Sequence, residues 1–139
     1  MERREFLHGT CLFCLGAGLG GLSAILSSCS SAPVYRAQVR AGRMEVPESL
    51  FERESVQVIR SAELTDDIAL VRIGEGDFRA YVMRCTHADN PLSYRGTEFA
   101  CSLHGSRFDT AGNVIHGPAV LPLRTLRTSI AGGVITIFV

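Results

Sequence analysis

The chain has 139 residues, and its 14 basic and 14 acidic side chains give a formal net charge of zero at pH 7. A length of this order suffices for one small domain, and a hydrophobic content of 46% gives that domain enough apolar side chains for a packed core. The balanced charge argues against nucleic-acid binding, which requires a strongly basic surface.

The first 29 residues are expected to be an export signal and a membrane anchor. Arg3 and Arg4, a spacer and then Phe-Leu resemble a twin-arginine signal, and an uncharged, glycine-rich apolar stretch follows over residues 9–26. The sequence Leu-Ser-Ser-Cys ending at Cys29 resembles a bacterial lipoprotein box, in which the cysteine is lipidated and becomes the new N-terminus. An uncleaved transmembrane anchor with an unmodified Cys29 is the alternative. Either form places the rest of the chain outside the cytoplasm, facing the periplasm or the cell exterior.

Three further side chains near the N-terminus are assigned to this signal. Cys11 and Cys14 form a C-x-x-C pair, but they lie in the apolar stretch with no βαβ pattern around them, so we expect no redox role for them. His8 is assigned to the signal as well. Residues 30–43, which begin Ser-Ser-Ala-Pro, show no clear apolar period and are expected to be a tether.

Residues 44–139 are expected to form one domain of short strands. Turn signals lie at 74–77 and at Ala131-Gly132-Gly133, and no long amphipathic helix is evident. The predicted strands cover residues 55–60, 68–73, 78–84, 98–100, 123–130 and 134–139. This pattern predicts an all-β fold, an antiparallel sandwich or barrel, with a loop-rich insertion over residues 85–109.

The insertion contains two boxes that each pair a cysteine with a histidine. The first is Cys85-Thr86-His87 and the second is Cys101-Ser102-Leu103-His104, and no other cysteine lies beyond residue 29. A zinc ion could take two cysteines and two histidines, but its usual spacing pairs like with like. A [2Fe-2S] cluster of mixed ligation takes both cysteines on one iron and both histidines on the other. The mixed composition of each box favours the cluster over zinc.

These boxes resemble the Rieske family's C-x-H and C-x-x-H-G-S-x-[FY]-D, and His-Gly-Pro-Ala at 116–119 resembles its Gly-Pro loop. The resemblance extends over residues 55–139. It implies one [2Fe-2S] cluster per subunit in a cluster-binding subdomain, shielded on a third side by Gly117 and Pro118. The implied ligands are Cys85, His87, Cys101 and His104. His116 lies outside the boxes and is expected to have a packing or solvent-facing role.

Two departures from the family pattern bear on the cluster. Rieske proteins of cytochrome bc-type quinol oxidases carry an additional cysteine in each box, joined as a disulfide, where this chain has Asn90 and Leu103. Those relatives also use a serine and a tyrosine whose hydroxyls donate to sulfurs. Ser106 matches the serine, but Phe108 replaces the tyrosine. Because a donor to sulfur stabilises the reduced cluster, its loss predicts a reduction potential in the lower half of the range of roughly −150 to +300 mV.

The length of the chain bears on function. A Rieske oxygenase needs a second domain with a mononuclear iron site, for which the chain is too short. We therefore expect an electron carrier that is not a catalyst by itself. It would take electrons from quinol or a cytochrome b-type, quinol-oxidising complex and pass them to a cytochrome, such as cytochrome c. The resemblance implies that His87 and His104 lie near the surface, so the edge that they form is the expected docking face. The alternative is the small Rieske subunit of an exported oxidoreductase, such as a molybdenum enzyme of the arsenite-oxidase kind.

Overall fold

The computed structural model describes residues 32–139. The twin-arginine sequence, the lipoprotein box with Cys29 and the first two residues of the expected tether lie outside the described residues, so these assignments stay predictions. Within 32–139, no helix has the length and apolar character needed to cross a membrane.

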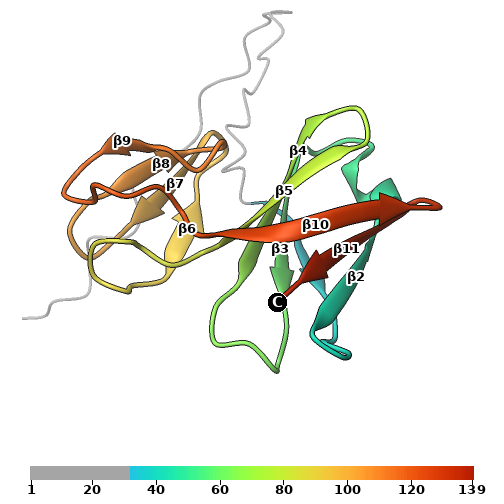
Figure 1. Cartoon of the computed structure of the whole chain (residues 1–139). Helices are drawn as coiled ribbons and strands as arrows, with labels where there is room; N and C mark the ends of the chain where they lie inside the picture. Colours follow the sequence, from blue (N-terminus) through green and yellow to red (C-terminus); the bar gives the residue numbers. More distant parts are fainter. Residues whose placement is uncertain (1–31) are drawn as a thin grey trace, which may run out of the picture.

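The described residues form two β-sheets and one short 3-10 helix, η1 (Glu48–Phe51) (Figure 1). The larger sheet has the order β1-β3-β4-β5-β10-β11-β2, and the smaller has the order β6-β7-β8-β9. The larger sheet consists of β1 (Val34–Arg36), β2 (Arg43–Pro47), β3 (Val56–Arg60), β4 (Ile68–Gly74), β5 (Asp77–Val82), β10 (Thr125–Ala131) and β11 (Val134–Phe138). The smaller sheet consists of β6 (Leu92–Tyr94), β7 (Glu98–Cys101), β8 (Arg107–Asp109) and β9 (Val114–His116).

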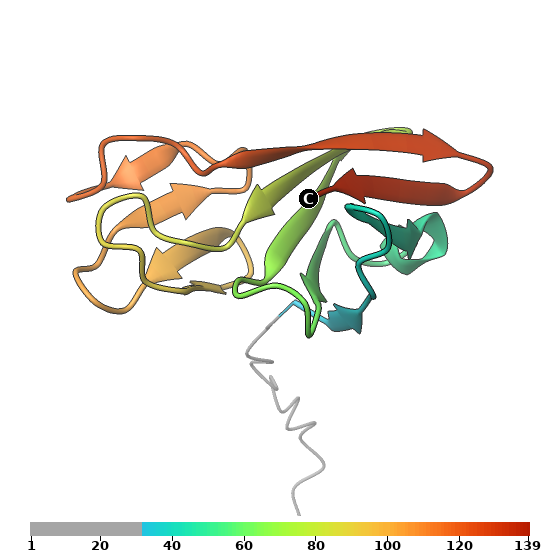
Figure 2. The same cartoon turned by 60° about the horizontal axis from the view of Figure 1, so that its bottom comes forward.

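The smaller sheet is an insertion between two neighbouring strands of the larger one. Strands β5 and β10 are paired with each other, and β6 to β9 lie between them in the chain. Both views place the smaller sheet at one end of the molecule and the β10–β11 hairpin at the other (Figures 1 and 2). The predicted all-β fold is thereby confirmed, and all strand pairs are antiparallel except β1 with β3.

The described part of the expected tether is built into the sheet. Strand β1 runs parallel to β3, the Val58 N–H donates to the Pro33 carbonyl at 3.0 Å, and the Ala37 N–H donates to the Arg60 carbonyl at 3.0 Å. The pairing satisfies backbone groups along the edge of β3 and requires no apolar alternation in β1. An expectation based on side-chain periodicity therefore misses this strand.

The two faces of β5 contact two separate cores, because successive side chains of a strand point to opposite faces. Phe78 and Ala80 point into a core formed within the larger sheet and η1, whose other members are Met44, Val46, Phe51, Ile59, Ile68, Leu70, Ile135 and Ile137. Tyr81 lies in a core that includes side chains of both sheets, among them Val56, Val71, Leu92, Phe99 and Phe108. Since full burial of an apolar side chain contributes about 1.5–3 kcal/mol, this shared core fixes the smaller sheet against the larger one.

The insertion is more ordered than its expected loop-rich character suggests. It contains the entire four-stranded sheet, and that sheet extends to His116, beyond the expected end at residue 109. Of its strands, β7 matches the strand predicted over residues 98–100. The other three have three residues each, which is too short for an alternating pattern to identify them.

Candidate metal centre

Two loops at the end of the smaller sheet hold the predicted ligands, and they share one backbone scheme. The Cys85 N–H donates to the Asn90 carbonyl at 2.8 Å, and the Cys101 N–H donates to the Ser106 carbonyl at 2.9 Å. In return, the Cys85 carbonyl accepts from the Asp89 N–H at 3.0 Å, and the Cys101 carbonyl accepts from the Gly105 N–H at 3.2 Å. Each cysteine is therefore held by the turn that follows it, in the same setting in both loops.

The four side chains sort by type rather than by box. Cys85 and Cys101 are buried, with 1% and 3% of their surfaces exposed. They form no disulfide, and both belong to the core shared by the two sheets. His87 and His104 are exposed, and their ring centroids lie 5.0 Å apart at an interplanar angle of 82°. The result is a buried thiol pair beside an exposed imidazole pair.

The surroundings of Cys101 favour an anionic sulfur. Burial raises the pKa of the Cys101 thiol, but several donors outweigh burial and hold this pKa below its ordinary value. The donors are the backbone N–H groups of Leu103 and His104 together with the Cys85 thiol and the Asn90 side chain. A thiolate is the form of cysteine that binds a metal, so this environment is suited to a metal-bound sulfur.

The segment after β9 contacts both loops. The Ala119 N–H donates to Ser106 Oγ at 3.0 Å, and Thr86 Oγ1 donates to the Leu121 carbonyl at 2.7 Å. The exposed Gly117 and Pro118 begin this segment, which therefore lies along a third side of the site. Because Ser106 Oγ accepts the Ala119 bond, its own proton remains available for an acceptor at the site.

Two other residues named from the sequence have clear positions. Phe108 is fully buried in the core shared by the two sheets, where it lies opposite Phe99 in the β7–β8 register. His116 ends β9 opposite Arg107 and is exposed, as expected for a residue outside the boxes.

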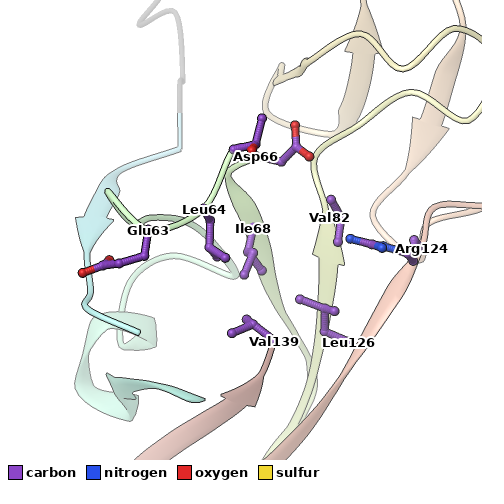
Figure 3. Close-up of a pocket in the computed structure, with 9 residues that line it drawn as sticks. Glu63, Leu64, Asp66, Ile68, Val82, Arg124, Leu126 and Val139 are labelled. Carbon is purple, nitrogen blue, oxygen red and sulfur yellow. The ribbon is translucent and has the colours of Figure 1, made fainter. Parts of the chain in front are cut away.

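The ion pair between Arg84 and Asp66 holds the first loop in place. The sequence alone did not indicate this pair. Arg84 Nη1 donates to the Asp89 carbonyl at 2.6 Å, and Arg84 Nε donates to Asp66 Oδ2 at 2.8 Å. Asp66 also lines a cavity of about 290 Å³ with Ile68 of β4 and Val82 of β5 (Figure 3). None of the four box residues lines this cavity, so it is separate from the metal centre.

The arrangement fits two metal ions better than one. Among residues 32–139, no three His, Cys, Asp or Glu side chains are grouped so that they could hold one ion. A tetrahedral zinc site would need all four box residues around a single point. A cluster with thiolates on one iron and imidazoles on the other needs the separation into two pairs that is observed. Fold and site together define a β domain in which two loops bring two cysteines and two histidines to one end.

The comparison with known families agrees with this class. The family model for the Rieske [2Fe-2S] domain matches residues 43–127, so the chain belongs to that family. Membership carries one [2Fe-2S] cluster per subunit, as the sequence predicted.

Curated relatives resemble the chain to different extents. The cytochrome b6-f complex iron-sulfur subunit of Trichodesmium erythraeum is 29% identical over 94% of this chain and 80% of its own length. Subunit 3 of the corresponding Nostoc complex is 38% identical, but the match covers 47% of this chain and 34% of that protein. The ubiquinol-cytochrome c reductase iron-sulfur subunit of Rickettsia felis is 31% identical over 55% of this chain and 45% of its own length.

A solved structure shares the fold. In the complex of reduced oxygenase and oxidized ferredoxin of carbazole 1,9a-dioxygenase, one chain matches with a TM-score of 0.53 and 19% identity. The match covers 71% of this chain and 94% of that chain. At this identity the likeness concerns the arrangement of strands alone.

Proposed function

We propose that this protein is an exported, membrane-anchored electron carrier that takes electrons from quinol or a quinol-oxidising, cytochrome b-type complex and passes them to a cytochrome. The observation that carries the proposal is the contrast in burial between the two ligand pairs. The cysteines are 1% and 3% exposed, whereas both histidines reach the surface. When bound, the cluster supplies one-electron transfer, and the imidazole edge is the side that a partner can approach most closely.

We further propose that Cys85 and Cys101 bind one iron and that His87 and His104 bind the other. The buried thiol pair and the adjacent imidazole pair support this assignment. Ser106 and the Gly117–Pro118 segment would enclose the cluster, since the Ala119 and Leu121 backbones are bonded to the two loops.

Exposed apolar side chains beside the histidines support a docking role for this edge. Leu103 lies within the second loop and is 54% exposed. Val120 and Leu121, which follow the Ala119 contact, are 87% and 62% exposed. Large apolar side chains grouped at a polar site mark a surface for a protein or an apolar ligand. This composition suits the hydrophobic face of a quinol or the rim of a cytochrome.

The relatives support the membrane setting of the proposal. Matched proteins are named as subunits of cytochrome b6-f complexes and of a ubiquinol-cytochrome c reductase. The N-terminal signal and box would deliver a folded, cluster-loaded domain across the membrane and keep it attached there.

Electron transfer by edge variants tests the docking role. Reduced protein would be mixed with ferricytochrome c in a stopped-flow instrument, and separately oxidised protein with a reduced short-chain quinol. Leu103→Ser and Leu121→Ser are expected to slow at least one reaction several-fold at an unchanged reduction potential. Val134→Ser is the matched control, because Val134 is 38% exposed in the hairpin at the opposite end of the molecule (Figure 1). Equal rates in all four proteins would reject the edge as the docking face.

Purification of the tagged full chain from native membranes tests the partner. Co-elution of haem b, seen in the reduced-minus-oxidised spectrum, is the expected result. Co-elution of molybdenum without haem b would replace the proposal with the alternative of a molybdenum-enzyme subunit.

A further inference from the structure

Asn90 connects the two loops of the metal centre. Its carbonyl accepts the Cys85 N–H at 2.8 Å within the first loop. Its side-chain Nδ2 lies 3.8 Å from Sγ of Cys101 in the second loop, as a donor to that sulfur. The same Nδ2 lies 3.1 Å from the Pro91 carbonyl, so the two amide protons have two separate acceptors. The amide is thereby oriented with one N–H toward the sulfur.

Asn90 occupies a position that bears on how the two loops are joined. Asn90 stands where relatives with a loop-joining disulfide have one of its cysteines, and the other position here is the exposed Leu103. No covalent bond joins the loops, because Cys85 and Cys101 are both free. The hydrogen bond from the Asn90 side chain to Cys101 Sγ joins the two loops directly.

A neutral amide donor acts differently on the two redox states of a cluster. Reduction adds one negative charge, which is shared with the sulfurs of the cluster and of its cysteines. A donor to a ligand sulfur stabilises that charge and raises the potential. The other groups that lower the pKa of Cys101 are the backbone N–H groups of Leu103 and His104 and the Cys85 thiol, and a substitution of Asn90 leaves all three in place. The Asn90 contribution can therefore be removed separately.

We propose that Asn90 is a positioning residue for the cluster: its side-chain amide holds the Cys101 sulfur across the two loops and raises the reduction potential. The proposal concerns the cluster that the family carries and is independent of which protein donates or accepts the electron. Its failure would leave the docking role untouched, since that role is tested by rates at constant potential.

The test compares two variants in the same loop. Asn90→Leu removes the donor at similar side-chain size, and Thr86→Val removes the bond to the Leu121 carbonyl, which involves no sulfur. Protein-film voltammetry of the cluster-loaded full chain is expected to show a lower potential for Asn90→Leu. A tenfold change in the redox equilibrium would correspond to about 59 mV for one electron. Thr86→Val is expected to lower the melting temperature. Its change in reduction potential is expected to be less than a third of the change in Asn90→Leu. An unchanged potential in Asn90→Leu, or an equal shift in both variants, would overturn the proposal.

A measurement on the unaltered chain covers the case in which Asn90→Leu does not assemble its cluster. Protein labelled with ¹⁵N in the side chain of asparagine would be reduced and examined by pulsed EPR. A weak ¹⁵N coupling from an amide next to a ligand sulfur is expected. The other asparagine, Asn113, donates to the Asp109 carboxylate at 3.2 Å, so an Asn113→Ser protein, which keeps the signal, assigns the coupling to Asn90. Absence of any ¹⁵N coupling would contradict the contact.

Discussion

Asp89 and Gly105 occupy the same place in the two loops of the metal centre. Each is the fourth residue after a box cysteine and donates its N–H to that cysteine's carbonyl. Both have positive φ, 49° at Asp89 and 81° at Gly105. Aspartate and glycine are among the residues that tolerate this left-handed region best. The turn that presents each cysteine thus depends on one residue of unusual backbone conformation.

The first prediction compares two glycines of nearly equal φ. Gly105→Ala is expected to lower the free energy of unfolding by about 1–2 kcal/mol, the cost of a side chain in the left-handed region, because an added Cβ would have no atom within 4 Å. Gly112→Ala is expected to cost more. Its φ is 82°, and its Cβ would lie 2.6 Å from Cε1 of the buried Tyr81. Denaturant unfolding of both variants measures the difference.

Gly76→Ala is the control for this comparison. Gly76 also has positive φ and open space around its Cβ, but it lies in the β4–β5 turn. Gly76→Ala is expected to have the same free energy of unfolding as Gly105→Ala. It is also expected to keep full cluster occupancy, because the β4–β5 turn is not part of the two loops of the metal centre. If Gly112→Ala were no less stable than Gly105→Ala, the close approach of Tyr81 would not be a constraint on the fold.

The second prediction concerns the four proposed ligands. Cys85→Ser and Cys101→Ser should abolish the cluster, because each would remove one of the two thiolates proposed to bind iron. His87→Ala and His104→Ala should abolish or severely disturb it. Iron analysis and the Rieske-type EPR signal of the reduced protein provide the measurement. His116→Ala should leave both unchanged, since this histidine is exposed at the end of β9. A wild-type signal from Cys101→Ser would disprove the assignment.

The third prediction concerns Phe108. Phe108→Tyr supplies the hydroxyl that disulfide-containing relatives have at this position, and a new donor to a ligand sulfur should raise the potential. One hydrogen bond contributes about 0.5–1.5 kcal/mol, which corresponds to roughly 20–65 mV for one electron. Voltammetry of the two proteins measures the shift. A downward shift, or a wild-type potential near the top of the family range, would mean that the donor argument is wrong for this site.

The fourth prediction concerns Cys29, which lies outside the described residues. Cys29→Ala should block lipid attachment and release the domain from washed membranes if the lipid is its anchor. Mass spectrometry of the mature N-terminus distinguishes the alternatives. An unmodified peptide that runs through Ser28 and Cys29 in the mature protein would exclude lipidation and favour the uncleaved anchor.

Much of this protein follows from local sequence patterns. The alternation of Phe78 and Ala80 with Tyr81 and Met83 matches the two cores that these side chains enter, since strand geometry sends successive side chains to opposite faces. The two glycines after Ala131 predict the β10–β11 hairpin, and both have positive φ as a tight turn requires. The composition and spacing of the boxes indicate the cluster, because metal chemistry limits which side chains can bind it.

Other features were decided only by the tertiary structure. The three-residue strands of the smaller sheet and the parallel pairing of β1 depend on backbone hydrogen bonds between distant segments, which leave no periodic side-chain signal. The same holds for the Arg84–Asp66 pair and for Asn90, which the sequence shows only as the lack of a cysteine. Residue types and spacing determined which cofactor the chain binds. Folding determined the contacts around that cofactor, because hydrogen bonds to its loops and sulfurs form only once remote segments are brought together.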